Sequence, residues 1–431
     1  MKDKRFTNNP YLIFSPFLII MITLVFIINT DGTNGDEGRF IFFANNILHG
    51  YYSPSAPNID LGNGPGYPIL LLPFIFFRLP LVCIPILNAI FYYFSIILIF
   101  KIINKLVGFR KALIFSLFLA FYINAYEVLP YIRYETFILF LISLIAFNIS
   151  RAVDPEYFTK SKTYLLLSGF FIGYLALTQP IFGYVMLVML TVIALLLIIN
   201  RKSVNYRKGM AVLIVALFVI SPYLIYTYNL TDKIFYLSTH GGNNLYWMSS
   251  PYENEYGSWL SFSKLKMEDI SDANNSNKFN METFKLNHQK VFNDISKFKG
   301  IELDDTLKKI AVNNIKSHPI KFVQNCTSNL GRILFNMPYS YKAQTPIFLI
   351  RLPFNGIIIV LALFSLIPTY LNWSKIPFSL RFMLSFAIIF IGGSIMGSAE
   401  TRMFTYTLPV LLIWIAFIIE KSINIKLKFD H

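Results

Sequence analysis

Residues 164–199 read YLLLSGFFIGYLALTQPIFGYVMLVMLTVIALLLII, and this stretch decides the fold class. It is apolar except around Thr178, Gln179 and Pro180 near its middle. About 20 apolar residues are enough for a helix to cross the hydrocarbon core of a bilayer. The stretch therefore predicts two membrane-spanning helices joined by a tight turn at 178–180.

The composition of the whole chain agrees with this prediction. Of its 431 residues, 55% are hydrophobic and 14% are charged, whereas a water-soluble chain carries roughly 25% charged residues. So few charges could not cover the cores of a soluble protein, and a bilayer removes that conflict. The net charge of +15 would suggest nucleic-acid binding in a soluble protein. Here Lys and Arg in cytoplasmic loops explain it, and we expect no nucleic-acid partner.

Further apolar runs predict eight more spans, which gives about ten in all. These runs are 11–28, 83–100, 112–129, 134–150, 209–228, 349–371, 377–396 and 403–420. The first run resembles a signal peptide, but its length and the lack of a small-residue cleavage site favour an uncleaved span. The segment Tyr67–Phe77 contains Pro68 and Pro73 and is short for a span, which favours an interfacial or re-entrant helix outside the membrane core.

The distribution of Lys and Arg predicts which loops face the cytoplasm. With the N-terminus inside, most basic residues near the spans fall in the inner loops or the C-terminal tail: Lys101, Lys105, Arg110, Lys111, Arg151, Lys160, Lys162, Arg201, Lys202, Arg207, Lys208, Lys375, Arg381, Lys421, Lys426 and Lys428. The short outer turns carry only Arg133 and Arg402. An eleventh crossing at Tyr67–Phe77 would reverse this pattern, so the charges favour ten spans.

This topology predicts an all-α, multi-pass membrane protein with two large outer loops, 29–82 and 229–348. We expect an N-terminal transmembrane module over 1–228 that includes the first outer loop. A large extracytoplasmic loop subdomain over 229–348 follows, and then a C-terminal transmembrane module over 349–431.

The first outer loop contains DGTNGDEGRF, in which Asp36 and Glu37 are adjacent acids soon after the first span. Apolar residues at helical spacing follow, so both acids are expected at the start of a short helix on the membrane surface. A carboxylate near a helix N-terminus is stabilised as the anion and can act as a general base or hold a cation. The simpler interpretation, which spacing alone favours, is an N-cap at Asp36 and a first-turn acid at Glu37.

Two more pairs of ionisable residues are predicted at the outer ends of spans, Arg133 with Glu135 and Glu400 with Arg402. Such residues usually face a cavity or a partner, although interfacial snorkelling is an equally simple explanation for each pair alone. Together with the acidic pair they would fall on one side of the membrane. Carboxylates and arginines there suit a polyprenyl-phosphate-linked sugar, because the departing phosphate needs a cation and the acceptor hydroxyl needs a base.

With these motifs, the chain resembles the GT-C superfamily of membrane glycosyltransferases. The likeness is to the branch of protein O-mannosyltransferases and lipid A aminoarabinose transferases. It covers residues 11 to 420 and rests on the order of several short motifs. The motifs are DEGRF at 36–40, GPGYP at 64–68, RYE at 133–135, the stretch containing GGNNLYW at 241–247, AVNNIKSHPIKFVQN at 311–325 and ETRMF at 400–404.

The resemblance implies a GT-C-like fold with helices lying on the outer membrane face. It also implies a polyprenyl-phosphate sugar donor and inversion at the anomeric carbon. The catalytic acid would be Asp36, with Glu37 as the second candidate. The residues that would bind substrate are Arg39, Tyr67, Arg133, Glu135, Glu400 and Arg402. Phe40 and Met403 replace tyrosines of the family pattern, which removes two hydroxyls but no charge.

The predicted enzyme is a hexosyl or pentosyl transferase in a bacterial plasma or inner membrane, with its active site facing outside. The acceptor is a hydroxyl of a protein, lipid or glycan, and we expect no metal and no cofactor. Two other classes remain as alternatives. An O-antigen polymerase or ligase also has many spans and a large outer loop, but it would not need the early acidic pair. A transporter or flippase usually carries polar residues in mid-span and inverted repeats, and neither is prominent here.

Overall fold

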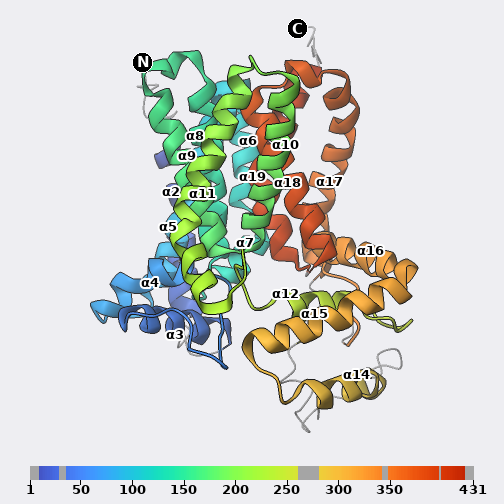
Figure 1. Ribbon diagram of the computed structural model, residues 1–431. Helices are drawn as coiled ribbons and strands as arrows, with labels where there is room; N and C mark the ends of the chain where they lie inside the picture. Colours follow the sequence, from blue (N-terminus) through green and yellow to red (C-terminus); the bar gives the residue numbers. More distant parts are fainter. Residues whose placement is uncertain (1–8, 29–34, 261–280, 342–347, 398, 423–431) are drawn as a thin grey trace, which may run out of the picture.

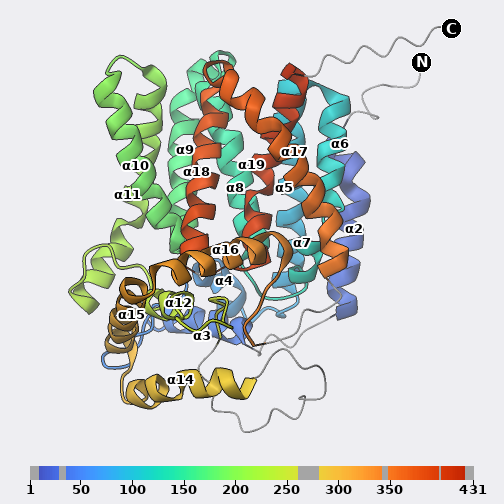
Figure 2. The ribbon, with the colours of Figure 1, turned by 90° about the vertical axis from the view of Figure 1, so that its right-hand side faces the viewer.

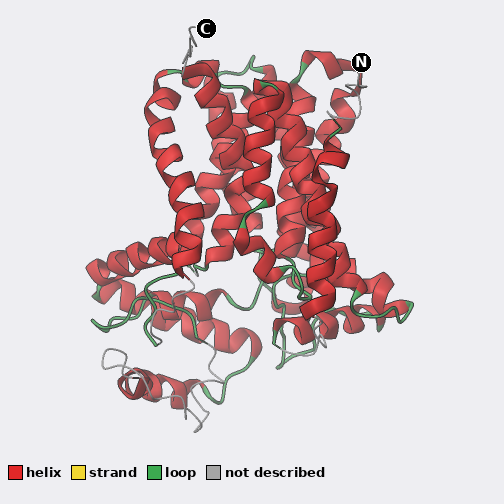
Figure 3. Ribbon diagram, turned by 180° about the vertical axis from the view of Figure 1, so that it is seen from behind, coloured by secondary structure: helices red, strands yellow, loops and turns green. Residues whose placement is uncertain are grey.

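The structure is a computed structural model, and it describes all residues except 1–8, 29–34, 261–280, 342–347, 398 and 423–431. The predicted tail lysines Lys426 and Lys428 lie outside the described residues. Within the described part every regular element is a helix, so the chain is all-α as predicted (Figure 3). The helices form a long bundle with a layer of shorter helices across one end (Figure 1).

The bundle contains the long apolar helices. They are α2 (Pro10–Ile28), α5 (Cys83–Val107), α6 (Phe109–Ala120), α7 (Ile123–Val128), α8 (Glu135–Val153), α9 (Ser161–Thr178), α10 (Ile181–Ile199), α11 (Val204–Thr231), α17 (Phe348–Leu371), α18 (Phe378–Met396) and α19 (Thr401–Ser422). Eight helices of the described chain are long and apolar enough to cross a membrane. The remaining two predicted spans correspond to α9, with 18 residues, and to the pair α6 and α7. The chain is an integral membrane protein.

The run 112–129, predicted as one span, is broken at Phe121 and Tyr122 into α6 and α7. Polar contacts accompany the break. The Asn124 amide donates to the Tyr122 hydroxyl at 2.7 Å, and that hydroxyl donates to Asn355 Oδ1 of α17 at 2.7 Å. Hydrophobicity alone could not reveal these contacts, because the partner on α17 is 233 residues away in the sequence.

The packing of the bundle is uneven, and α19 lies at its centre. In the most apolar stretch of α19, 83% of the residues are buried, whereas the corresponding value for α17 is 17%. Helix α19 contacts α5, α8, α17 and α18, so residues at its start are held from several sides. Small residues permit close approach elsewhere: a Cβ on Gly169 or Gly173 of α9 would lie within 3 Å of side-chain or backbone atoms of α11.

The layer at one end of the bundle consists of the segments predicted as outer loops. It contains α3 (Asp36–Leu48), α4 (Gly66–Phe76), α12 (Gly241–Met248), α14 (Met281–Ile295), α15 (Gly300–Ser317) and α16 (Pro319–Phe335). Three connections lie at the opposite end of the bundle (Figures 1 and 2). They join α5 to α6, α8 to α9 through the short helix η1 (Pro155–Lys160), and α10 to α11. The predicted outer and inner loops are therefore at opposite ends of the molecule.

Helix α4 is a short helix of 11 residues beside α3, in the layer at the end of the bundle. The glycine-rich turn before it contacts the last turn of α9. Gly64 has φ 91°, and a Cβ there would lie 2.3 Å from the Leu177 carbonyl oxygen. The GNGPG stretch thus fixes α3 and α4 against the bundle.

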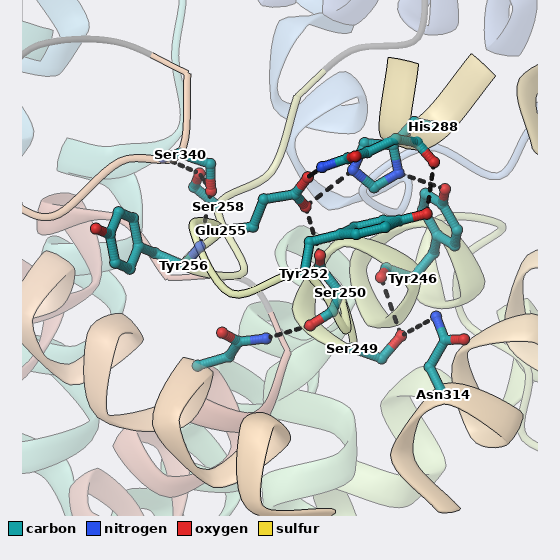
Figure 4. A network of polar contacts seen from close by, with 12 residues as sticks. Tyr246, Ser249, Ser250, Tyr252, Glu255, Tyr256, Ser258, His288, Asn314 and Ser340 are labelled. Carbon is teal, nitrogen blue, oxygen red and sulfur yellow. Dashed lines mark hydrogen bonds and ion pairs between the residues drawn. The ribbon is translucent and has the colours of Figure 1, made fainter. Parts of the chain in front are cut away.

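A buried polar network holds the chain after α12 against α14 (Figure 4). Glu255 is 3% exposed. It accepts hydrogen bonds from the Ser250 hydroxyl and from the Asn287 amide, the latter at 2.9 Å, and its Oε2 lies 2.9 Å from His288 Nε2. The Tyr246 hydroxyl contacts the other ring nitrogen of His288 at 2.6 Å. The network satisfies a carboxylate that would be costly to bury alone, and we assign it a structural role.

The contact between Gly64 and Leu177 leads to a first prediction. Gly64→Ala should destabilise the protein, because a left-handed conformation costs an L-residue roughly 1–2 kcal/mol and the added Cβ would also clash with backbone. Gly392→Ala is the matched control, since nothing lies within 4 Å of a Cβ built there. Thermal unfolding of the detergent-purified chain should show a lower Tm for Gly64→Ala alone. Equal Tm values for the two variants would contradict the close approach.

Candidate active site

Arg402, in the first turn of α19, joins the sequence-predicted site residues. Its Nη1 lies 2.8 Å from Glu135 Oε1 and 4.0 Å from Asp36 Oδ2, and its Nε lies 2.9 Å from Glu400 Oε2. The carboxylates come from the start of α8, the start of α3 and the residue before α19. The structure thus brings together acids that are up to 364 positions apart, between Asp36 and Glu400.

Asp36 is not the N-cap of α3, which corrects the simpler interpretation of the acidic pair. Gly35 is the N-cap, and no side-chain capping bond forms. The Asp36 carboxylate instead accepts a hydrogen bond from Arg39 Nη2 at 2.9 Å and lies close to Arg402 on its other side. Its side chain is 35% exposed, so a ligand could reach it.

Glu37 occupies a different environment from its neighbour. The residue is 5% exposed, and its Oε1 accepts a hydrogen bond at 2.8 Å from the backbone N–H of Ile132, in the turn before α8. This bond ties α3 to the segment that carries Arg133. Glu37 is therefore placed to support the site, whereas the Asp36 side chain is partly open to solvent.

Tyr67 packs beneath the acidic pair in an aromatic cluster. Its ring meets Phe40 at 5.0 Å and Tyr134 at 6.2 Å between centroids, and Tyr67 is fully buried. Burial raises the pKa of the Tyr67 phenol, and the nearby carboxylates of Glu135 and Glu37 raise it further. The phenol is neutral at physiological pH. The ring of Phe40, where the family pattern has Tyr, fills the centre of this cluster.

A polar cavity of about 230 Å³ opens beside Arg402. Its lining residues are Asn124, Glu127, Val128, Arg133, Asn336, Tyr339, Arg351, Glu400, Thr401 and Arg402. The three arginines exceed the two glutamates by one positive charge. A cavity with this excess of positive charge suits an anionic ligand.

The three arginines of the cavity differ in their partners. Arg402 is surrounded by carboxylates, and Arg351 of α17 is paired with Glu127 of α7, with Nε 3.1 Å from Oε1. Arg133 has no carboxylate within ion-pair distance in the part of the chain that the structure describes, and its guanidinium lies 5.4 Å from the ring centre of Tyr131. Arg133 is therefore the cation whose charge is most available to a ligand.

Sequence reasoning missed Glu127 and Arg351 as site residues. Both fall inside runs that were assigned to spans, and their pairing depends on the break between α6 and α7. It also missed Asp60 and His240, whose Oδ1 and Nε2 atoms are 3.8 Å apart. Burial lowers the pKa of His240, although Asp60 opposes the shift, so the ring is neutral at physiological pH. No short sequence motif marked these four residues.

An apolar groove of about 280 Å³ lies between α17, α18 and α19. On α19 it extends from Phe404, one turn after the cavity residue Thr401, to Trp414. Ten residues of helix span about 15 Å, which is half the thickness of a bilayer hydrocarbon core. On α17 the groove begins at Ile358, two turns after the cavity residue Arg351. Polar cavity and apolar groove thus follow each other along the same helices.

The family model of the dolichyl-phosphate-mannose-protein mannosyltransferases matches residues 73–226 of the chain. This match confirms the resemblance to the GT-C superfamily. The matched segment runs from α4 through α11 and includes Arg133 and Glu135, but it contains neither Asp36 nor Arg402. It supports assigning the chain to the membrane glycosyltransferases.

Two solved structures of ArnT from Cupriavidus metallidurans, one bound to undecaprenyl phosphate and one in the apo state, are also similar to the chain. Each alignment has 12% sequence identity and a TM-score of 0.41, and covers 94% of this chain and 77% of the other. A likeness at this level does not establish a shared activity. No curated protein matches the chain at a significant level.

The ion pair between Arg402 and Glu135 leads to a second prediction. Removing one partner of a buried pair leaves an uncompensated charge and is strongly destabilising, whereas removing both is better tolerated. Arg402→Gln should therefore lower the thermal stability of the purified protein, and Glu135→Gln in the same chain should restore part of it. We expect a coupling free energy of about 1–3 kcal/mol in a double-mutant cycle. Strictly additive effects would contradict the pairing.

Proposed function

We propose that the chain transfers a sugar from a polyprenyl-phosphate donor to an acceptor hydroxyl, in the layer formed by α3, α4, α12 and α16. The observation that carries the proposal is the arrangement of the site. The partly exposed carboxylate of Asp36 lies 4.0 Å from Arg402. Arg402 lines a cationic cavity, and an apolar groove lies further along α17 and α19. A donor of this class has one anionic and one long apolar part, and each part has a matching surface.

The donor phosphate is assigned to the cavity, with Arg133 as its main cation. The sequence predicts that both Arg133 and Arg402 bind substrate, and the proposal assigns the phosphate mainly to Arg133. Arg402 already faces the three carboxylates of Asp36, Glu135 and Glu400, so its charge is more than balanced. Arg133 lines the same cavity without a carboxylate partner among the described residues. Its planar guanidinium can donate two parallel hydrogen bonds to a phosphate.

The isoprenoid tail is assigned to the groove between α17, α18 and α19. The groove is lined almost entirely by apolar side chains, including Ile358, Leu384, Phe404 and Leu411. Burial of an apolar chain contributes roughly 25 cal/mol per Å². The groove starts about one helical turn after the cavity on α19 and about two turns after it on α17, so we assign both to one donor molecule.

Asp36 is assigned the role of general base. As the acceptor oxygen attacks the anomeric carbon, its proton moves to the Asp36 carboxylate and the new oxygen–carbon bond forms. The bond from that carbon to the phosphate oxygen breaks, and its electron pair leaves with the phosphate, where Arg133 stabilises the charge. A single displacement of this kind inverts the anomeric carbon. The contacts of Glu37 with the Ile132 N–H support Asp36 over Glu37 for this role.

The remaining predicted residues are assigned to positioning. Arg39 holds the Asp36 carboxylate through the 2.9 Å hydrogen bond. Glu135 and Glu400 hold Arg402 in place. Tyr67 supports α3 from below through its contact with Phe40. We further propose that the site faces the outside of a bacterial plasma membrane, as the loop charges predict.

The role of Asp36 gives a third prediction. Asp36→Asn keeps the size of the side chain but removes its basicity, and general-base catalysis contributes typically 10²–10⁴-fold. Mass spectrometry of surface glycans should show the sugar substituent in cells that express the native chain and its loss with Asp36→Asn. Asp294→Asn, an exposed position on α14, is the matched control and should behave as the native chain. Full modification by a correctly expressed Asp36→Asn protein would disprove the assignment.

The role of Arg133 gives a fourth prediction, for binding and not for chemistry. Arg133→Gln should weaken binding of a synthetic polyprenyl phosphate to the purified protein by about 10- to 100-fold, because hydrogen bonds to charged groups contribute about 1.5–3 kcal/mol. Arg133→Lys should restore part of the affinity. Arg78→Gln, at an exposed residue after α4, serves as the control. If Arg133→Gln and Arg78→Gln bind the lipid equally well, the phosphate does not lie beside Arg133.

A further inference from the structure

A second charged cavity lies at the end of the bundle opposite to the candidate active site. Its volume is about 490 Å³. The last turns of α5 and α8, the helix η1 and the start of α18 enclose it. The proposed transfer reaction uses none of these residues, so the cavity calls for a separate explanation.

Arg151, in the last turn of α8, is the central cation of this cavity. Its guanidinium lies 4.0 Å from the ring centre of Phe147 and 4.8 Å from that of Tyr157, and its Nη1 donates a hydrogen bond to the Tyr164 hydroxyl at 3.1 Å. No carboxylate in the described parts of the chain lies within ion-pair distance of it. The aromatic rings fix the position of the guanidinium, and nearby Asp154, whose pKa Arg151 helps to lower, offsets part of its charge without forming an ion pair.

Lys101 adds a second cation on the α5 side of the cavity. Its Nζ donates to the Tyr11 hydroxyl at 2.6 Å and has no carboxylate partner among the residues that the structure describes. The acid in the lining, Asp154, is already paired with Lys105. Lys105 also contacts Glu156 at 2.5 Å. The cavity therefore offers two cations to a ligand and no unpaired acid.

Apolar side chains make up much of the remaining lining, among them Ile102, Leu106, Phe147 and Val153. The cavity therefore combines cationic and apolar groups. It lies where spans end, a region in which aromatic residues mark the membrane–water boundary. A free inorganic anion would use only the cationic side. A phospholipid uses both, because its phosphate and its glycerol and acyl parts are adjacent.

We propose that this cavity binds the headgroup of an anionic phospholipid, with its phosphate between Arg151 and Lys101. The lipid contacts α5, α8 and α18 together, so it stabilises the end of the bundle that is remote from the active site. The site is independent of the transfer reaction, and failure of either assignment leaves the other untouched. Its chemistry is that of a phosphate diester next to apolar chains.

The test measures lipid binding to the full-length protein in neutral detergent. The probe is dioctanoyl phosphatidylglycerol, with dioctanoyl phosphatidylcholine as the zwitterionic comparison and inorganic phosphate as the free anion. Binding is followed by the dose-dependent rise in Tm, because a ligand of the folded state stabilises it by mass action. Phosphatidylglycerol should give a saturable rise that phosphatidylcholine and inorganic phosphate do not reproduce.

Variants locate the site. The double variant Arg151→Gln and Lys101→Gln should raise the Kd for phosphatidylglycerol at least tenfold, while Lys202→Gln, an exposed residue at the same end of the bundle, should leave it unchanged. Arg151→Lys keeps the charge and should retain most of the affinity. It serves as the second test if the glutamine variant folds poorly. Equal responses to the two lipids, protection by inorganic phosphate alone, or unchanged affinity in the double variant would each overturn the proposal.

Discussion

The site depends on one electrostatic constraint: a single arginine at the start of α19 lies between carboxylates from three separate segments. A buried guanidinium needs compensating charge, and buried carboxylates need a cation. Arg402 meets this need for the buried Glu135, and it also contacts the partly exposed Asp36 and Glu400. The first outer loop, the start of α8 and the start of α19 are thereby held at one point, and the geometry around Asp36 follows from that.

The same constraint separates the roles of the arginines. Because Arg402 is occupied by carboxylates and Arg351 by Glu127, the cavity retains one available guanidinium, that of Arg133. Net charge would not have distinguished them, since all three line the same space. The distinction comes from their partners, which belong to different helices. It gives the site one arginine suited to hold an anion and another that is held among carboxylates.

Much of this architecture could be predicted from hydrophobicity and charge. The length of apolar runs predicts the spans, and the turn at Gln179 and Pro180 between α9 and α10 lies where the polar interruption indicated. The break at Tyr122 was not predicted, because it depends on a hydrogen bond to Asn355 on a distant helix. The environments of Asp36 and Glu37 were also beyond sequence reasoning. Adjacent residues on one helix point to different surroundings, and only the packing of α3 against the turn before α8 decides which acid is buried.

The low burial of α17 within the bundle has a consequence for how a lipid could reach the groove beside it. The helix buries few of its residues, and the groove beside it faces the region that hydrocarbon would occupy. A prenyl lipid held there could enter and leave sideways by diffusion within the leaflet, without being drawn out into water. The rate of turnover would then depend on the number of carrier-lipid molecules per unit of membrane area. The bulk concentration of the lipid would not set this rate.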